Sequence, residues 1–105
     1  MKADWSQQAR LDLIQILKRV AADNPGAARK LLGRIEKAEA LVLDHPMSGR
    51  VVPEFEVANI RERIVKPYRV IYQVQLQGIL FLTVIHSRQD FRRIGQASFD
   101  VPDEP

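Results

Sequence analysis

The segment from Asn59 to Arg93 carries most of the side chains through which this chain could do chemistry. Its acids are only Glu62 and Asp90, whereas its bases are Arg61, Arg63, Lys66, Arg69, Arg88, Arg92 and Arg93. Arginine suits phosphate recognition because its planar guanidinium can donate two hydrogen bonds to one phosphate or carboxylate. The segment therefore predicts a phosphate-binding surface. The plainer alternative is that long cationic side chains solvate the edges of a sheet.

Arg69 is the most unusual of these bases because it lies in an apolar strand pattern, "KPYRVIYQV". Side chains alternate along a strand, so Arg69 should share one face with Ile71 and Gln73, while Tyr68 and Tyr72 lie on the other. We expect the tyrosine face to pack under helices and Arg69 to lie on the opposite, uncovered face. A structural role, in which Arg69 pairs with Glu62 or with acids of the C-terminus, is the alternative.

The turn between this strand and the preceding one decides which bases gather around Arg69. A turn of three residues would bring Arg61, Arg63 and Arg69 to one face, and a turn of two residues would separate them. On one face, with His86 and Arg88 at the rim of the sheet, they would form a concave cationic site.

Composition limits the classes of protein to consider. The chain has 105 residues, of which 46% are apolar and 28% charged, which fits one soluble globular domain spanning residues 1–105. It has no cysteine, and its two histidines, His45 and His86, lie far apart, so we expect neither a metal nor another cofactor. No segment resembles a signal peptide or a membrane span, so the expected location is the cytoplasm, with no membrane partner.

The N-terminal half predicts an antiparallel helical hairpin over residues 4–44. Asp4 is expected to cap the first helix, whose apolar stripe begins at Trp5 and which ends near Asp23. Asn24 and Pro25 supply the cap and first residue of the second helix.

The C-terminal half predicts a small twisted antiparallel sheet over residues 50–87. The stretches "ANIRERIV", "YRVIYQV" and "ILFLTVIH" are separated by short turns and should form a meander, with the third strand in the interior of the sheet. Residues 88–105 should form a short helix or a tail. The predicted fold class is α+β, with the hairpin packed on the sheet.

Three stretches together resemble the RelE/ParE superfamily of bacterial toxins from type II toxin–antitoxin systems, also called plasmid stabilisation proteins. They are the N-terminal "W...A..DL..I" pattern, "NP.AA..L...I..A...L...P..GR", and "IRERIVKPYRVIYQV...ILFLTVIHSRQ". The resemblance covers residue 5 to about residue 93. It implies a helical hairpin on an antiparallel sheet, in agreement with the reading of the residues themselves.

The resemblance to RelE-like members implies a ribosome-dependent mRNA endonuclease, which needs no metal. In that reading Arg69 is the phosphate clamp, His86 the proton-transfer group and Arg88 a second catalytic arginine, while Arg61, Arg63 and Lys66 bind the nucleic acid. Glu54 and Glu56 are further possible bases. RelE-like nucleases commonly end with a functional Tyr. Here the nearest aromatic residue after the last strand is Phe91, which cannot donate a proton.

The resemblance to ParE-like members implies a second activity, the inhibition of DNA gyrase without nucleolysis. A third alternative is an inactive relative whose main partner is the antitoxin. We favour the mRNA endonuclease from the sequence and keep the gyrase inhibitor as the main alternative. In every case the resemblance implies a cognate antitoxin as a partner, with the ribosome and mRNA, or else DNA gyrase, as the target.

Overall fold

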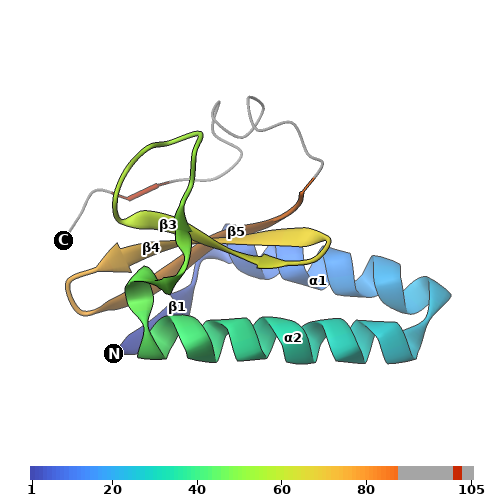
Figure 1. Cartoon of the computed structure of the whole chain (residues 1–105). Coiled ribbons are helices and arrows are strands. Elements are labelled where there is room, and N and C mark those ends of the chain that lie inside the picture. The colour runs from blue at the N-terminus through green and yellow to red at the C-terminus, as the bar shows by residue number, and fades with distance from the viewer. Residues whose placement is uncertain (88–100, 103–105) are drawn as a thin grey trace.

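A computed structural model describes residues 1–87 and 101–102 of the chain. Arg88, predicted as a second catalytic arginine, lies outside the described residues, as does most of the predicted C-terminal segment 88–105. The elements run in the order β1 (Lys2–Trp5), α1 (Gln7–Asp23), α2 (Pro25–Asp44), the 3₁₀ turn η1 (Pro46–Ser48), β2 (Arg50–Val51), β3 (Ile60–Val65), β4 (Tyr68–Gln75) and β5 (Gly78–His86). The two helices lie side by side beneath the sheet (Figure 1). The predicted α+β class and helical hairpin are therefore confirmed.

The start of the chain differs from the prediction. Residues Lys2–Trp5 form a strand that runs parallel to β5, so the sheet is mixed and has the order β1-β5-β4-β3-β2. The cap of α1 is Ser6 rather than Asp4, because the Ser6 hydroxyl accepts a hydrogen bond from the Ala9 amide. Trp5 belongs to β1 and stacks on Phe81 of β5. The strand was missed because its partner lies more than seventy positions away in the sequence.

The second helix follows the prediction. Asn24 accepts a hydrogen bond from the Ala27 amide and Pro25 is the first helical residue, so a single residue separates α1 from α2. The expected interior place of the third strand is also confirmed, since β5 lies between β1 and β4.

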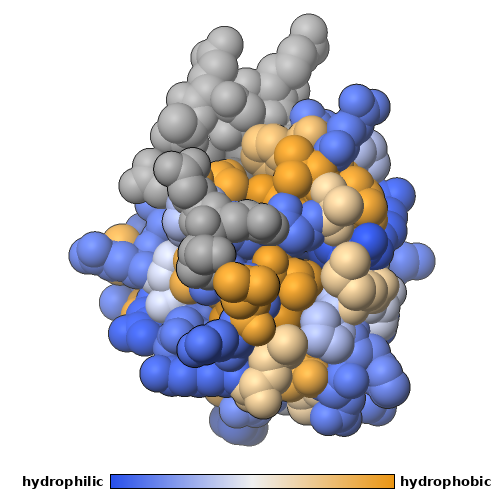
Figure 2. Space-filling model, turned by 90° about the vertical axis from the view of Figure 1, so that its left-hand side faces the viewer, coloured by the Kyte–Doolittle hydropathy of each residue, from blue (hydrophilic) through white to orange (hydrophobic). Residues whose placement is uncertain are grey.

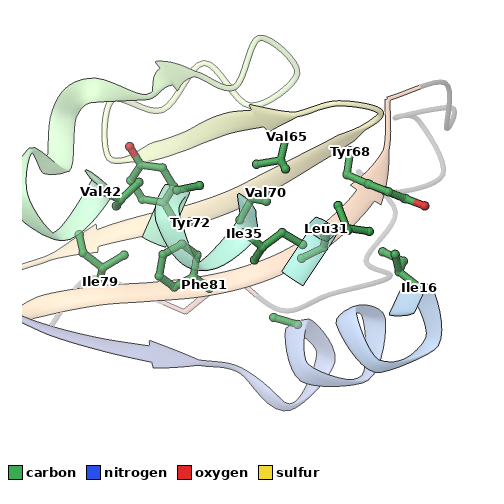
Figure 3. Packing of buried hydrophobic residues seen from close by; sticks show 13 residues of the cluster. Ile16, Leu31, Ile35, Val42, Val65, Tyr68, Val70, Tyr72, Ile79 and Phe81 are labelled. Atoms are coloured by element: carbon green, nitrogen blue, oxygen red, sulfur yellow. The ribbon is translucent and has the colours of Figure 1, made fainter. Parts of the chain in front are cut away.

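The main core fills the space between the helices and one face of the sheet, here called the helix face. Ile16 of α1 and Leu31, Ile35 and Val42 of α2 pack against Tyr68, Val70 and Tyr72 of β4 and their neighbours on β3 and β5 (Figure 3). Tyr72 is fully buried. Its hydroxyl donates to the Pro46 carbonyl (2.8 Å) and accepts from the Gly49 amide (3.0 Å), and burial raises the pKa of this phenol. The bond joins the loop after α2 to the middle of the sheet.

A second, smaller apolar cluster lies on the opposite face, here called the outer face. It is made of Val52, Ile60, Ile71, Leu82 and Ile85, with Phe55 and Leu80 packed beside them. The outer face also carries Gln73, whose amide donates to the Pro102 carbonyl over 2.8 Å. This is the face on which Arg69 lies.

Gly78 permits the close approach of β1 to β5. A Cβ atom at this position would lie 2.5 Å from the Lys2 carbonyl oxygen, closer than any real contact. We therefore expect Gly78→Ala to lower the free energy of unfolding by about 1–3 kcal/mol and to speed hydrogen exchange at the Ser6 amide, which bonds Phe81 in the native chain.

Gly33 supplies the matched control, because it lies in the middle of α2 with no atom within 4 Å of an added Cβ. Gly33→Ala should instead stabilise the chain by about 0.5–1 kcal/mol. Chemical denaturation of both variants checks the pair. A Gly78→Ala variant as stable as the native chain would show that β1 is not held in this register.

Candidate functional site

The predicted cationic surface is divided between the two faces of the sheet. The turn between β3 and β4 holds two residues, Lys66 and Pro67, and Ile64 pairs with Arg69 across the strands. Paired residues share a face, so Glu62 and Ile64 lie with Arg69 on the outer face. Arg61 and Arg63, paired with Tyr72 and Val70, extend from the helix face. The arrangement with three arginines on one face is therefore excluded.

Arg61 holds the loop after α2 in place. Its guanidinium donates to the backbone carbonyls of Met47 (3.2 Å), Gly49 (2.9 Å) and Ala58 (2.9 Å). These bonds occupy donors that a nucleic-acid phosphate would need. Lys66 is exposed in the turn, and its predicted role in nucleic-acid binding stays a prediction.

Arg69 is a buried residue, with 7% of its surface exposed. Its Nε donates to Glu62 Oε1 over 2.6 Å. The Glu62 carboxylate is fully buried, and its second oxygen accepts a hydrogen bond from Nε of Arg50 on β2. One buried carboxylate thus joins strands β2, β3 and β4. The pairing of Arg69 with Glu62, which the sequence offered as the structural alternative, is therefore present.

The terminal nitrogens of Arg69 are engaged by a second carboxylate, that of Glu54. Nη1 lies 3.2 Å from Oε2 and Nη2 lies 3.1 Å from Oε1, so the pair is bidentate. Burial alone would raise the pKa of Glu54, but the hydrogen bonds from Arg69 and its positive charge outweigh this effect and lower the pKa. Burial likewise tends to lower the pKa of Arg69, and the two carboxylates raise it instead. Both shifts favour the charged forms of Glu54 and Arg69.

His86 lies on the other side of the sheet from Arg69. It pairs with Tyr68 across β4 and β5, and the two rings meet edge to face with centroids 5.6 Å apart. Both residues line a groove of about 590 Å³ against α1, next to Gln15 and Arg19. The two described members of the predicted catalytic set, Arg69 and His86, therefore face in opposite directions.

Within residues 1–87 and 101–102, no group of three or more histidine, aspartate or glutamate side chains is placed to hold a metal ion. In the same part, no helix has the length and apolar character needed to cross a bilayer.

The partners of Arg69 were only partly anticipated by the sequence. The sequence predicts Glu62 as a possible partner of Arg69 and Glu54 as a possible catalytic base, and it gives no role to Arg50. A usable signal was present, because a two-residue turn at "KP" puts Glu62 on the same face as Arg69. The contact between Glu54 and Arg69 depends on the path of the loop 52–59. A loop has no periodic pattern of apolar residues from which its path could be predicted.

The Arg69–Glu62 pair predicts a specific pattern of stability. Arg69→Met should lower the free energy of unfolding by about 3–5 kcal/mol, because it leaves a buried carboxylate with one partner fewer. Combining Arg69→Met with Glu62→Leu should bring stability back to within about 1 kcal/mol of the native chain, because an apolar pair of similar size replaces the charges. Arg50, which is mostly exposed, remains hydrated in the double variant.

Urea denaturation of both variants measures this pattern, with Lys66→Met as the control for loss of an exposed cation. The control should change stability by less than about 0.5 kcal/mol. A double variant as unstable as Arg69→Met alone would contradict the assignment of the pair.

Comparisons with known proteins agree with this architecture. Residues 3–91 match the model of the family described as ParE toxin of type II toxin–antitoxin system, parDE. A putative toxin, Y4kP, of Sinorhizobium fredii is 27% identical over 92 residues, which cover 86% of this chain and 92% of that protein. The fold is similar to that of a chain in the chromosomal ParDE system of P. aeruginosa, with a TM-score of 0.67 and 22% identity over 82% of this chain and 95% of that one. The family match spans most of the sequence, and the chain therefore belongs to the ParE toxin family of type II toxin–antitoxin systems.

Proposed function

We propose that this chain is a growth-inhibiting toxin that acts on DNA gyrase without cleaving RNA and is neutralised by a cognate antitoxin. The single observation that carries the choice between gyrase and mRNA is the state of Arg69. Its guanidinium is bound by two carboxylates of its own chain, and the side chain as a whole is 8% exposed. Membership of the ParE family supports the same branch, because the ParE-like members of the superfamily are the ones that act on gyrase.

The requirements of RNA cleavage are poorly met by the described residues. Attack of a ribose 2′-OH on the next phosphate needs cations open to the phosphate, together with a base and an acid near the same point. Arg69 is engaged by Glu54 and Glu62, and His86 extends from the opposite face. The mRNA endonuclease favoured from the sequence stays a prediction, and the experiment below tests it as well.

The surface is better suited to protein partners than to a phosphate backbone. A groove of about 400 Å³ between β1, α1 and α2 is lined by apolar residues such as Ile14 and Leu32, with Glu36 and Glu39 among its polar residues. The groove also contains Asp4 and one cation, Arg10, so its acids outnumber its cations and would repel a nucleic acid. On the end of the molecule shown in Figure 2, apolar residues also gather into a patch surrounded by hydrophilic ones. Exposed apolar surface of this kind supports binding to gyrase and to an antitoxin.

The test is brief expression of the chain in growing bacteria with two readouts in the same cultures. We expect covalent gyrase–DNA complexes to accumulate while primer extension shows no new 5′ ends within translated codons. A strain that expresses the chain with its antitoxin should show neither effect.

The double variant Arg69→Met/Glu62→Leu provides the matched comparison, because it removes the guanidinium while the fold is expected to persist. Under the present proposal it stays toxic. A nuclease that uses Arg69 as its clamp would instead lose about 10²–10³ in rate in this variant. New 5′ ends that disappear in the variant, without trapped gyrase, would replace the proposal with the endonuclease.

A further inference from the structure

We propose that two copies of this chain associate through the outer edges of their β1 strands, so that the two sheets join into one. β1 has β5 on one side, and within residues 1–87 and 101–102 no strand lies on its other side. An edge of this kind presents backbone groups that can pair with another chain. The inference does not depend on gyrase being the target.

The backbone groups at the outer edge of β1 belong to Ala3 and Trp5. The Ser6 amide donates to the Phe81 carbonyl of β5, and the Lys2 carbonyl also faces β5. Backbone groups of successive strand residues point to opposite sides, so those of Ala3 and Trp5 point away from β5. They are the groups that a second strand would bond.

The charges of β1 select one register for a second copy. In an antiparallel pair related by two-fold symmetry, only residues on the same face of the sheet lie opposite each other. A pair centred on Ala3 puts Lys2 of each copy opposite Asp4 of the other, which gives two attractive pairs. Centres at Lys2 or Asp4 would instead oppose two like charges, which is unfavourable. The pattern is therefore complementary to itself only when Ala3 opposes Ala3.

Lys2 and Asp4 are available for these pairs. Within one chain their charged groups are 3.9 Å apart, and the side chains are 78% and 58% exposed. An exposed pair of this kind contributes little to stability, so its exchange for a pair with the second copy costs little. Charges on a short edge strand usually prevent unwanted pairing. Here their alternating signs leave pairing with a second copy favourable.

The helix face supplies an apolar contact in the same register. Ala3 and Trp5 pack on that face, and Met1 of the second copy lies opposite Trp5. Trp5 lines the groove of about 400 Å³ next to Ile14, which is 48% exposed, and Met1 is 66% exposed. A methionine sulfur packs favourably against an aromatic ring. Each copy therefore contributes Met1 to the groove of the other, and a partner protein seated in this groove would compete with the second copy.

The first test is the mass of the purified chain by sedimentation equilibrium. It should rise from 12.0 kDa toward twice that value as the concentration increases. A range from about 1 μM to about 1 mM is suitable, because an interface of this size is expected to be weak. Trp5 is the only tryptophan, so its emission should change over the same range as Met1 of the second copy covers it.

Two charge reversals test the register. Lys2→Glu and Asp4→Lys each place like charges opposite one another, and each should raise the dissociation constant of the dimer by about tenfold or more. An equimolar mixture of the two variants should restore association, because every charge then meets its opposite across the interface while neither chain has an internal pair. Lys66→Glu is the matched control. It reverses an exposed cation in the turn between β3 and β4 and should associate like the native chain.

Ala3→Pro tests the backbone pairing independently. Proline removes the outward amide of Ala3 and leaves the bonds between β1 and β5, since proline fits an edge strand where the N–H faces solvent. The variant should keep the thermal midpoint within a few degrees and remain a monomer.

Four results would overturn the inference. A native chain that stays monomeric throughout the range has no such interface. A dimer that persists in folded Ala3→Pro uses another surface. Failure of the mixed charge variants to associate more strongly than either alone excludes the register. A monomeric native chain whose binding to its antitoxin is lost in Ala3→Pro would assign the edge to the antitoxin instead.

Discussion

The fully buried carboxylate of Glu62 is the constraint on which the outer half of this structure depends. A charged group without water must be paired, and here two guanidiniums from neighbouring strands supply the partners. Arg50 fixes the two-residue strand β2 to β3, and Arg69 fixes β3 to β4. Arg69 in turn holds Glu54, and through it the loop that passes beside the small apolar cluster of the outer face. The ion pairs of Arg50, Glu54, Glu62 and Arg69 therefore connect the strands and the loop of the outer face.

The same constraint bears on function. An arginine in an apolar strand suggests a phosphate clamp when the strand is considered alone. Its charge, however, is needed inside the protein, because Glu62 has no water to solvate it. The two-residue turn also separates the basic residues, since it puts Arg61 and Arg63 on the helix face, where Arg61 bonds the loop after α2. A toxin that acts by binding proteins is consistent with this use of its arginines.

The parts of the fold that depend on local signals were predictable from the sequence. Asn24 and Pro25 mark the boundary between the helices because capping is decided by neighbouring residues. The interior place of β5 followed from its apolar character on both faces. β1 was missed because four residues, one of them Asp4, carry no strand pattern and acquire one only by pairing with Gly78–Phe81. The sequence was enough to predict that Arg69 lies on the face of the sheet away from the helices. Its partners could not be predicted, because they depend on the length of the turn between β3 and β4 and on the path of the loop 52–59.

The most direct test of the account is whether the Arg69 guanidinium is held inside the protein. The Nε–Hε group of Arg69, bonded to the buried Glu62, can be observed by ¹⁵N-resolved NMR and its exchange with solvent can be measured at neutral pH. The account predicts a single signal that exchanges far more slowly than those of exposed arginines such as Arg10, and that shifts strongly in Glu62→Gln. Rapid exchange, with no response to Glu62→Gln, would show that Arg69 faces solvent and would restore it as a candidate clamp for RNA.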